Sequence, residues 1–460
     1  MEGSSTTAGR NELETFLAEN PDIQHVDAIL MDLCGIVRGK RYPRADLPKL
    51  FAGGMQFPYT LYLLDVTGES LDPRGKGFSD GDPDGTGMPV PGTLVRAPWA
   101  KQPRGQVLVT MFDNEGRPSI WDPRNVAARV VERFKEIGLR PVVAFELEFC
   151  LLDQERDADG FPQPAICPST GKRDTQSQVN SIPMLDEFSD FFQEVEAAAL
   201  MQKVPCSVAN VEYGLGQYEI NLRHVEDPLA AADHCALLRY IVKRVAARHG
   251  MEATFMAKPH AEETGNGLHV HISLIDADGN NAFDDGSAPG NPLGNETLRH
   301  AIGGLAASMA EAMAICAPNV NSYRRFGANL FVPVAKSWGL NNRSFAFRIP
   351  DAPGNARRVE HRVAGADANP YLLLAALLAG MHHGITNRID PGEPWQGNAS
   401  AKVDPDLPMK LEPALARLAR GTILPDYLTR EYTDTYCATK QAEYDKFCNA
   451  VSRREYAWYL

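Results

Sequence analysis

Alternating apolar and polar positions predict a buried strand at residues 141–153, PVVAFELEFCLLD. Every second side chain, from Val143 to Phe149, is apolar and shares one face of the strand. The opposite face carries Glu146 and Glu148, which repel each other and are costly to desolvate unless a positive group lies beside them. The stretch therefore predicts a strand whose polar face serves a cation or a polar site.

Similar patterns predict further strands separated by helices. The other expected strands of this region are 207–211, 217–223, 252–256, 267–275, 343–349 and 357–363. Three helices begin with a capping Asp or Asn followed by Pro in the first turn. They start at Asp122-Pro123 (to Gly138), Asp227-Pro228 (to Gly250) and Asn369-Pro370. We predict an α+β fold with a large domain over residues 120–460.

The first part of the chain differs from the rest in its composition and in its pattern of apolar positions. Strands are expected within 25–43 and at 106–113, and residues 67–93 between them are dense in Gly, Pro and Asp, which indicates a long loop. The polar start predicts a disordered leader over residues 1–12, followed by a small domain over 13–115.

Composition narrows the function classes. The chain has 460 residues and a formal net charge of −13, which argues against nucleic acid as a partner. Its longest apolar stretch, residues 371–381, is too short for a bilayer span of about 20 residues. The eight cysteines are scattered without a CxxC pair, as expected for free thiols in a reducing compartment. We expect a soluble, cytoplasmic protein without a membrane partner.

Polar residues recur on one face of several predicted strands. These residues are Glu146, Glu148, Glu212, Glu219, His269, His271, Glu360 and Arg362. Each pair of polar residues on one strand is, by itself, typical of a solvated sheet face. Together, however, these residues are more potential metal ligands than chance would place on such faces. Five carboxylates with a single ligating imidazole suit Mg²⁺ or Mn²⁺ better than Zn²⁺.

Arginines accompany these acids in the sequence. They are Arg325, Arg343, Arg348, Arg358 and Arg362. Arginine beside divalent metals is suited to phosphate and carboxylate groups. The residues thus predict metal-dependent phosphoryl transfer from a nucleotide. Residues 35–41 and 265–270 only partly match the usual phosphate-loop and dinucleotide patterns, and 80–85 lacks the Glu that completes a calcium loop.

The joint pattern resembles the glutamine synthetase superfamily from about residue 25 onward. The motifs that carry this resemblance are FELEF (145–149), the Glu212/Glu219 pair, GNGLHVHISL (265–274), NSYRR (321–325), NRSFAFRIP (342–350), ARRVEHR (356–362) and ADANPYLLLAALLAG (366–380). The resemblance implies a small N-terminal β-grasp domain and a catalytic domain with a curved antiparallel sheet and flanking helices. It also implies a dodecamer of two hexameric rings, with active sites between neighbouring subunits.

The resemblance further implies roles for individual residues. One metal would be held by Glu148, Glu212 and Glu219, and a second by Glu146, His269 and Glu360, with two to three Mg²⁺ or Mn²⁺ ions per site. ATP would contact His271, Ser273, Arg343 and Arg358. Glutamate would contact Glu148, Gly265, His269, Arg325 and Arg362. Arg348 would face the transferred phosphoryl group, so that Arg325, Arg348 and Glu360 are the expected catalytic residues.

Departures from the family pattern concern the nitrogen donor. Phe331 stands where the resemblance places an ammonium-binding Glu, and Phe57 where it places an Asp. Two aromatic rings offer an apolar wall for an alkyl chain or a cation–π contact with an ammonium group. In this respect the chain is similar to the γ-glutamyl amine ligases of the superfamily, such as γ-glutamylpolyamine synthetases and glutamate–putrescine ligases.

We therefore expect ATP-dependent ligation of the γ-carboxylate of L-glutamate to a primary amine of a polyamine, through γ-glutamyl phosphate, in polyamine catabolism. Putrescine, spermidine and spermine are the expected amines. Three alternatives stay open: an ammonia-using glutamine synthetase, a ligase for another small amine such as ethanolamine, and a non-catalytic relative. Presence of all six expected metal ligands argues against the last of these.

Overall fold

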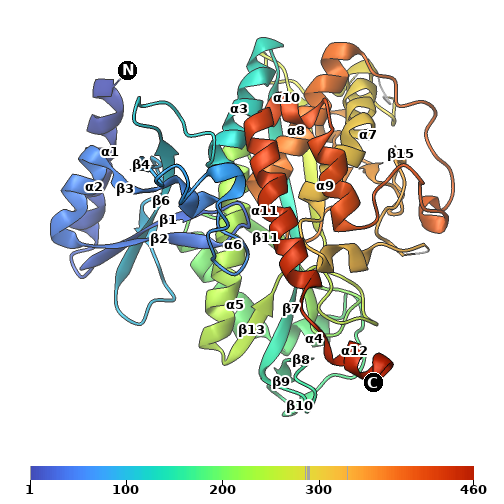
Figure 1. The fold of residues 1–460 in the computed structure, drawn as a ribbon, viewed down its shortest axis with the longest axis horizontal. Coiled ribbons are helices and arrows are strands. Elements are labelled where there is room, and N and C mark those ends of the chain that lie inside the picture. Colours follow the sequence, from blue (N-terminus) through green and yellow to red (C-terminus); the bar gives the residue numbers. More distant parts are fainter. Residues whose placement is uncertain (1, 285, 287–290, 329) are drawn as a thin grey trace.

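Two sheets organise the chain, one built from the first quarter of the sequence and one from its middle (Figure 1). The computed structural model describes residues 2–284, 286, 291–328 and 330–460. Helices surround the larger sheet, and the smaller sheet lies at one side of the molecule with helices α1 and α2 at its margin. The architecture is mixed, so the predicted α+β class is confirmed.

The smaller sheet has the strand order β2-β1-β6-β4-β3, with β5 paired to β6. Its strands are β1 (His25–Met31), β2 (Val37–Pro43), β3 (Met55–Pro58), β4 (Asp84–Pro89), β5 (Val95–Arg96) and β6 (Arg104–Phe112). Strand β1 runs antiparallel to β2 and parallel to β6. Strand β4 lies within the stretch predicted to be a loop, so that prediction is wrong for residues 84–89. The β-grasp topology and the domain limits 13–115 and 120–460 stay predictions.

The N-terminus differs from the predicted disordered leader. Helix α1 (Glu2–Glu19) covers most of residues 1–12, and Met1 lies outside the described residues. The helix is anchored by Leu13 and Phe16, which are buried in the core of this region. Gly105 on β6 provides room for the Phe16 ring, since a Cβ there would lie 3.1 Å from it. These two apolar anchors hold the second half of α1 against the core.

The larger sheet follows the order β11-β12-β7-β14-β17-β16-β15, and β8 and β13 also pair with β7. Its strands are β7 (Arg140–Arg156), β8 (Pro162–Pro164), β11 (Cys206–Val211), β12 (Gln217–Leu222), β13 (Met251–Thr254), β14 (Leu268–Ile275), β15 (Trp338–Leu340), β16 (Phe347–Ile349) and β17 (Val359–His361). All described pairings are antiparallel except β15 with β16. The strands expected from alternation are present, but 343–349 and 357–363 are shortened to Phe347–Ile349 and Val359–His361. Strands β8 and β15 and the separate ribbon of β9 (Ile166–Cys167) with β10 (Lys172–Arg173) were not expected.

The three capped helices begin where the sequence predicts. They are α3 (Pro123–Glu136), α6 (Pro228–Arg248) and α8 (Pro370–Asn387). The side chains of Asp122, Asp227 and Asn369 each accept hydrogen bonds from the first-turn backbone N–H groups. The other helices are α2 (Leu47–Gly53), α4 (Ile182–Asp186), α5 (Ser189–Met201), α7 (Glu296–Cys316), α9 (Leu411–Ala419), α10 (Leu424–Leu428), α11 (Arg430–Cys448) and α12 (Arg453–Tyr459).

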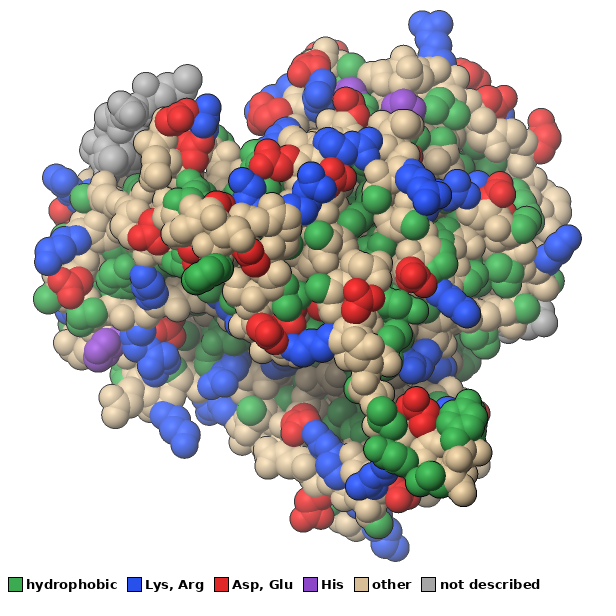
Figure 2. All heavy atoms as spheres, in the orientation of Figure 1, with side chains coloured by type: hydrophobic (Ala, Val, Ile, Leu, Met, Phe, Trp, Pro, Cys, Tyr) green, Lys and Arg blue, Asp and Glu red, His purple; other side chains and the backbone are tan. Residues whose placement is uncertain are grey.

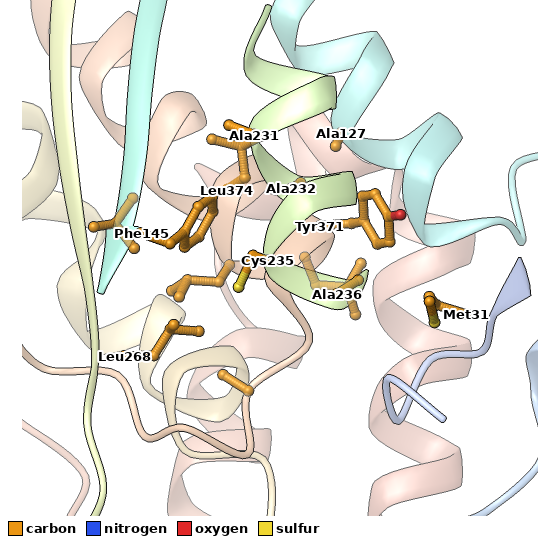
Figure 3. Packing of buried hydrophobic residues seen from close by; sticks show 14 of the residues in the cluster. Met31, Ala127, Phe145, Ala231, Ala232, Cys235, Ala236, Leu268, Tyr371 and Leu374 are labelled. Carbon is orange, nitrogen blue, oxygen red and sulfur yellow. The ribbon is translucent and has the colours of Figure 1, made fainter. Parts of the chain in front are cut away.

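The apolar face of the larger sheet packs against α6 and α8. Figure 3 shows Phe145 of β7 and Leu268 of β14 directed toward Cys235 of α6 and Leu374 of α8. All four side chains are buried, and burial of such side chains supplies most of the stabilisation of a core. None of the described helices combines the length and the apolar character that a membrane span requires. On the face shown in Figure 2, acidic and basic side chains are interspersed.

Candidate active site

The polar face of the larger sheet brings acids, histidines and arginines from five adjacent strands into register. On β7, Phe145, Leu147 and Phe149 are buried in the core while Glu146 and Glu148 lie on the opposite face. Across the neighbouring strands, Glu148 pairs with Glu219, and Glu146 pairs with His269. On the far side, His271 and Arg348 both pair with Glu360. Residues separated by up to about 200 positions therefore meet because the strands are aligned.

Glu146 is the central carboxylate of this face. Its Oε1 lies 2.8 Å from Nε2 of His271, and its Oε2 lies 3.2 Å from Nδ1 of His269. Nε of Arg358 donates to Nδ1 of His271 at 3.1 Å, so Nε2 of His271 carries the proton and donates to Glu146. Two groups have ligand atoms close enough for one metal ion: Glu146 with Glu219 and His269, and Glu146 with His271 and Glu360.

These groups differ from the two ligand sets predicted from the sequence. Glu146 belongs to both groups, His271 joins one of them, and Glu148 and Glu212 belong to neither. Both of these carboxylates accept hydrogen bonds from the protein instead: Glu148 from Gly267 N at 2.7 Å, and Glu212 from Nδ2 of Asn210 at 2.7 Å. The predicted partition of the metal ligands into two triads stays a prediction, and the six residues lie around the same face of the sheet.

Several buried carboxylates lie close together, and this changes their pKa values. Burial, followed by the charges of Glu146, Glu148 and Glu212, raises the pKa of Glu219 to about 10. Burial and the charge of Glu148 raise the pKa of Glu212 to about 7. Such groups repel one another unless a cation compensates, and oxygen-rich sets with an imidazole fit Mg²⁺ or Mn²⁺. The donor set therefore fits the metals expected for this site.

Two of the acids are instead stabilised in their charged form. Burial opposes the ionisation of Glu146, but hydrogen bonds from His269 and His271 hold its pKa well below the usual range. Burial likewise opposes ionisation of Glu360, but Arg362 and other nearby cations lower its pKa to about 2. Arg348 and Arg362 each form an ion pair with one oxygen of Glu360. These two arginines are thereby held beside the candidate metal positions.

Arg325 is the last residue of the 3-10 helix Asn321–Arg325. The side chain is buried, Nη1 donates to the carbonyl of Val363 at 3.2 Å, and Nε has no hydrogen-bond partner among the described residues. Gly265 allows this approach, because a Cβ there would lie 2.6 Å from Cγ of Arg325. A buried guanidinium with a free donor is suited to a carboxylate ligand.

Gln217 is a site residue that the sequence reading missed. Its Nε2 donates to Glu148 and to the carbonyl of Gly265, both at 3.1 Å. Its Oε1 accepts from Thr264 Oγ1 at 2.6 Å, so one amide joins the strand β12 to the loop before β14. The available signal was its place two residues before Glu219, which puts both side chains on the same face of β12.

A cleft with a volume of about 1270 Å³ opens beside His271 and Arg358. It is also lined by Ser273 and Glu146, so three of the four residues expected to contact ATP border it. Arg343, the fourth, is exposed and is not part of this lining; its carbonyl accepts from Nε of Arg362 at 3.0 Å. The cleft additionally contains residues that the sequence reading did not single out: Asn221, Arg223, His224 and Asn355.

The two aromatic residues predicted for an amine pocket lie in different surroundings. Phe331 is 63% exposed in the loop that follows Arg325. Phe57 is only 2% exposed and packs against Tyr62, with ring centroids 6.0 Å apart. Strand β3 directs Phe57 into the core beneath Gly87, where an added Cβ would lie 2.5 Å from the ring. Phe57 thus packs in the core of its own chain, and its place in an amine pocket stays a prediction.

Comparison with known proteins identifies the class to which this site belongs. A family described as the glutamine synthetase catalytic domain matches residues 121–459, and the chain belongs to this family. It is 41% identical over 99% of its length to γ-glutamylputrescine synthetase PuuA of Escherichia coli strain K12, covering 95% of that protein. It is 33% identical to a glutamate–isopropylamine ligase of a Pseudomonas species, covering 96% of each chain. The solved GmaS/ADP complex superposes with a TM-score of 0.83 at 27% identity, over 97% of this chain and 99% of the other.

Proposed function

We propose that the protein ligates the γ-carboxylate of L-glutamate to a primary amine of a polyamine, with putrescine, spermidine or spermine as the nitrogen donor and ATP as the energy source. The observation that carries this proposal is the 41% identity to a γ-glutamylputrescine synthetase along nearly the whole chain. Support also comes from the acid, histidine and arginine face of the larger sheet, which suits a metal-dependent phosphoryl transfer.

In this proposal the acidic face holds two to three Mg²⁺ or Mn²⁺ ions. The ligands are Glu146, Glu148, Glu212, Glu219, His269 and Glu360, and His271 adds an imidazole to the group around Glu146. When bound, the ions neutralise phosphate oxygens and orient them for transfer. Stabilisation of the crowded carboxylates by a cation is consistent with the raised pKa values of Glu212 and Glu219.

In this proposal, ATP and glutamate bind at two different ends of the site, each beside a different set of arginines. ATP would occupy the cleft beside His271, Ser273 and Arg358. Arg343 stays a further predicted contact of ATP. Glutamate would bind near Gly265, Arg325 and Arg362. Arg348, held against Glu360, would stabilise charge on the transferred phosphoryl group.

The chemistry then has two steps. A γ-carboxylate oxygen of glutamate attacks the γ-phosphorus of ATP, which forms γ-glutamyl phosphate and releases ADP. The lone pair of an unprotonated amine attacks the acyl carbon, phosphate leaves with the oxygen that had joined it to carbon, and the ammonium proton formed on nitrogen is lost. The products are a γ-glutamyl amide, ADP and phosphate.

An assay of ADP release with glutamate and a panel of nitrogen donors tests this function. We expect putrescine, spermidine or spermine to support faster release at equal concentration than ammonium, ethanolamine or isopropylamine. Equal or better turnover with ammonium would favour a glutamine synthetase, and a preference for ethanolamine would favour a ligase for another small amine. Failure of every donor would contradict the assignment as a ligase.

A further inference from the structure

Two exposed aromatic rings stack against each other beside the candidate site. Tyr213 and Phe331 have ring centroids 5.9 Å apart and an interplanar angle of 26°. The side chains are 55% and 63% exposed, so each ring keeps a large apolar surface in contact with water. None of the described lysine and arginine side chains lies over either ring, although cations do lie over other aromatic rings of this chain. The ring surfaces are thus available to a ligand.

Tyr213 is held in place by the turn that carries Glu212. The N–H of Glu212 donates to the carbonyl of Gln217 at 2.9 Å, and the N–H of Gly214 donates to the Gln217 side chain at 2.8 Å. The N–H of Leu215 donates to the carboxylate of Glu263 at 3.3 Å, which fastens the turn to the loop before β14. With its neighbours fixed on both sides, Tyr213 presents its ring outward from a rigid backbone.

Tyr213 and Phe331 each lie close in the chain to a residue proposed for the glutamate end of the site. Tyr213 follows a candidate metal ligand, and Phe331 belongs to the loop that comes after Arg325, the buried guanidinium near Gly265. Neither ring lines the cleft beside His271 and Arg358. The pair therefore lies on the side where the acyl group of glutamate would meet its nucleophile, rather than on the nucleotide side.

We propose that Tyr213, together with Phe331, determines the specificity of the protein for amines that carry a second positive charge. The inference rests on the proposed ligase function and extends it from the reacting amine to the distal end of the donor. The methylene chain packs along the two rings, and the distal ammonium group lies over a ring face, where the ring quadrupole attracts it. An uncharged distal end lacks this attraction, so the pair favours α,ω-diamines over monoamines of the same length.

The test compares two donors that differ only at the distal end, 1,4-diaminobutane and n-butylamine. For each variant, kcat/KM is measured for both donors by ADP release and by detection of the γ-glutamyl product. A ratio of the two values cancels any general loss of activity from misfolding or weaker ATP binding. In Tyr213→Leu, which keeps apolar bulk and removes the ring, we expect the ratio to fall by roughly 3- to 30-fold, the range that one cation–π contact supports. Tyr213→Phe should keep the wild-type ratio.

Two further variants complete the design. Phe331→Leu should lower the ratio in the same direction, and the double variant with Tyr213→Leu should lose less than the product of the single effects, because the two rings form one binding surface. Phe161→Leu, at an exposed aromatic of similar accessibility on the loop after β7, is the matched control and should leave the ratio unchanged. A ratio in Tyr213→Leu within twofold of wild type would overturn the inference while leaving the ligase function intact. If wild-type protein ligates neither donor, both the proposed function and this inference fail.

Discussion

At the scale of single residues, the site depends on how buried carboxylates are compensated. Glu146 and Glu360 are compensated within the chain, by two histidines and by two arginines. Glu219 is not: burial and three neighbouring carboxylates raise its pKa to about 10. At neutral pH this side chain therefore takes up a proton on folding, which costs stability, and a bound cation would favour its ionised form instead.

Replacement of Glu219 by Gln tests this account. At pH 7.5 we expect Glu219→Gln to raise the free energy of unfolding of the metal-free protein by about 1–3 kcal/mol, because Gln folds without the proton uptake that Glu219 requires at this pH. Stabilisation by millimolar Mg²⁺ or Mn²⁺ should be smaller than in wild type. Urea unfolding with and without metal measures both effects; a metal-free variant less stable than wild type, with unchanged metal response, would contradict the assignment.

A second residue gives a pH-dependent prediction away from the site. Asp32, in the turn between β1 and β2, is buried, and burial raises its pKa to about 6 in spite of hydrogen bonds from Ile36 N and Arg38. A folded-state pKa above the unfolded value means that stability from this group is present at low pH and is lost as the pH rises from about 4 to about 6. Asp32→Asn removes this dependence.

We therefore expect the unfolding free energy of Asp32→Asn, relative to wild type, to increase by up to about 3 kcal/mol between pH 4 and pH 6.5. The lost ion pair with Arg38 adds an offset that does not change the direction of the trend. Urea titrations at several pH values measure the difference. A difference that stays flat or declines over this interval would show that Asp32 does not titrate as described.

At the scale of elements, close contact between α7 and α8 supports the sheet that carries the site. Gly304 of α7 meets Gly380 and Gly384 of α8, and a Cβ at Gly304 would lie 2.0 Å from the Gly380 carbonyl oxygen. Helix α8 in turn contributes Leu374 to the core beneath Phe145 on β7. Separation of the two helices would thus be transmitted to the strand that carries Glu146 and Glu148.

Gly304→Ala should destabilise the protein by about 3 kcal/mol or more, because the helices must move apart to accommodate the methyl group. Gly53→Ala is the matched control: Gly53 ends helix α2, and an added Cβ there meets no atom within 4 Å. This control should be neutral or slightly stabilising. Chemical denaturation of both variants measures the difference, and equal stabilities would contradict the close packing.

At the scale of the whole molecule, the two sheets are joined by specific contacts. Nδ2 of Asn369, the residue that caps α8, donates to the carbonyl of Asp32 at 2.8 Å. Lys446 of α11 pairs with Glu69 at 2.6 Å, which ties the C-terminal helices to the N-terminal region. These contacts hold the smaller sheet in a defined place relative to the active face.

We predict that this unit assembles into a dodecamer of two hexameric rings, as the family resemblance implies. Mass photometry of the native protein should give a main species near 600 kDa, twelve times the 50.4 kDa chain. A species near half this mass would indicate a single ring. A monomer or dimer that is fully active would contradict the expectation that sites form between subunits.

Sequence patterns predicted most helices and strands, but they did not predict which side chains lie close together. The alternation in β7 and the capping of α3, α6 and α8 are local, and the structure confirms them. Strand β4 was hidden by its Gly, Pro and Asp composition, and only pairing with β3 and β6 makes it a strand. The grouping of Glu146 with both histidines and the burial of Phe57 depend on strand register and core packing, which no local pattern specifies.

Transfer of an oxygen label tests the central claim most directly. Glutamate labelled with ¹⁸O in both γ-carboxylate oxygens is incubated with ATP, Mg²⁺ and putrescine, and the products are analysed by mass spectrometry. Attack of the amine on γ-glutamyl phosphate should leave one ¹⁸O in inorganic phosphate and one in the γ-glutamylputrescine formed. Unlabelled phosphate together with unchanged glutamate would show that ATP is hydrolysed without activation of the carboxylate, and would contradict the proposed function.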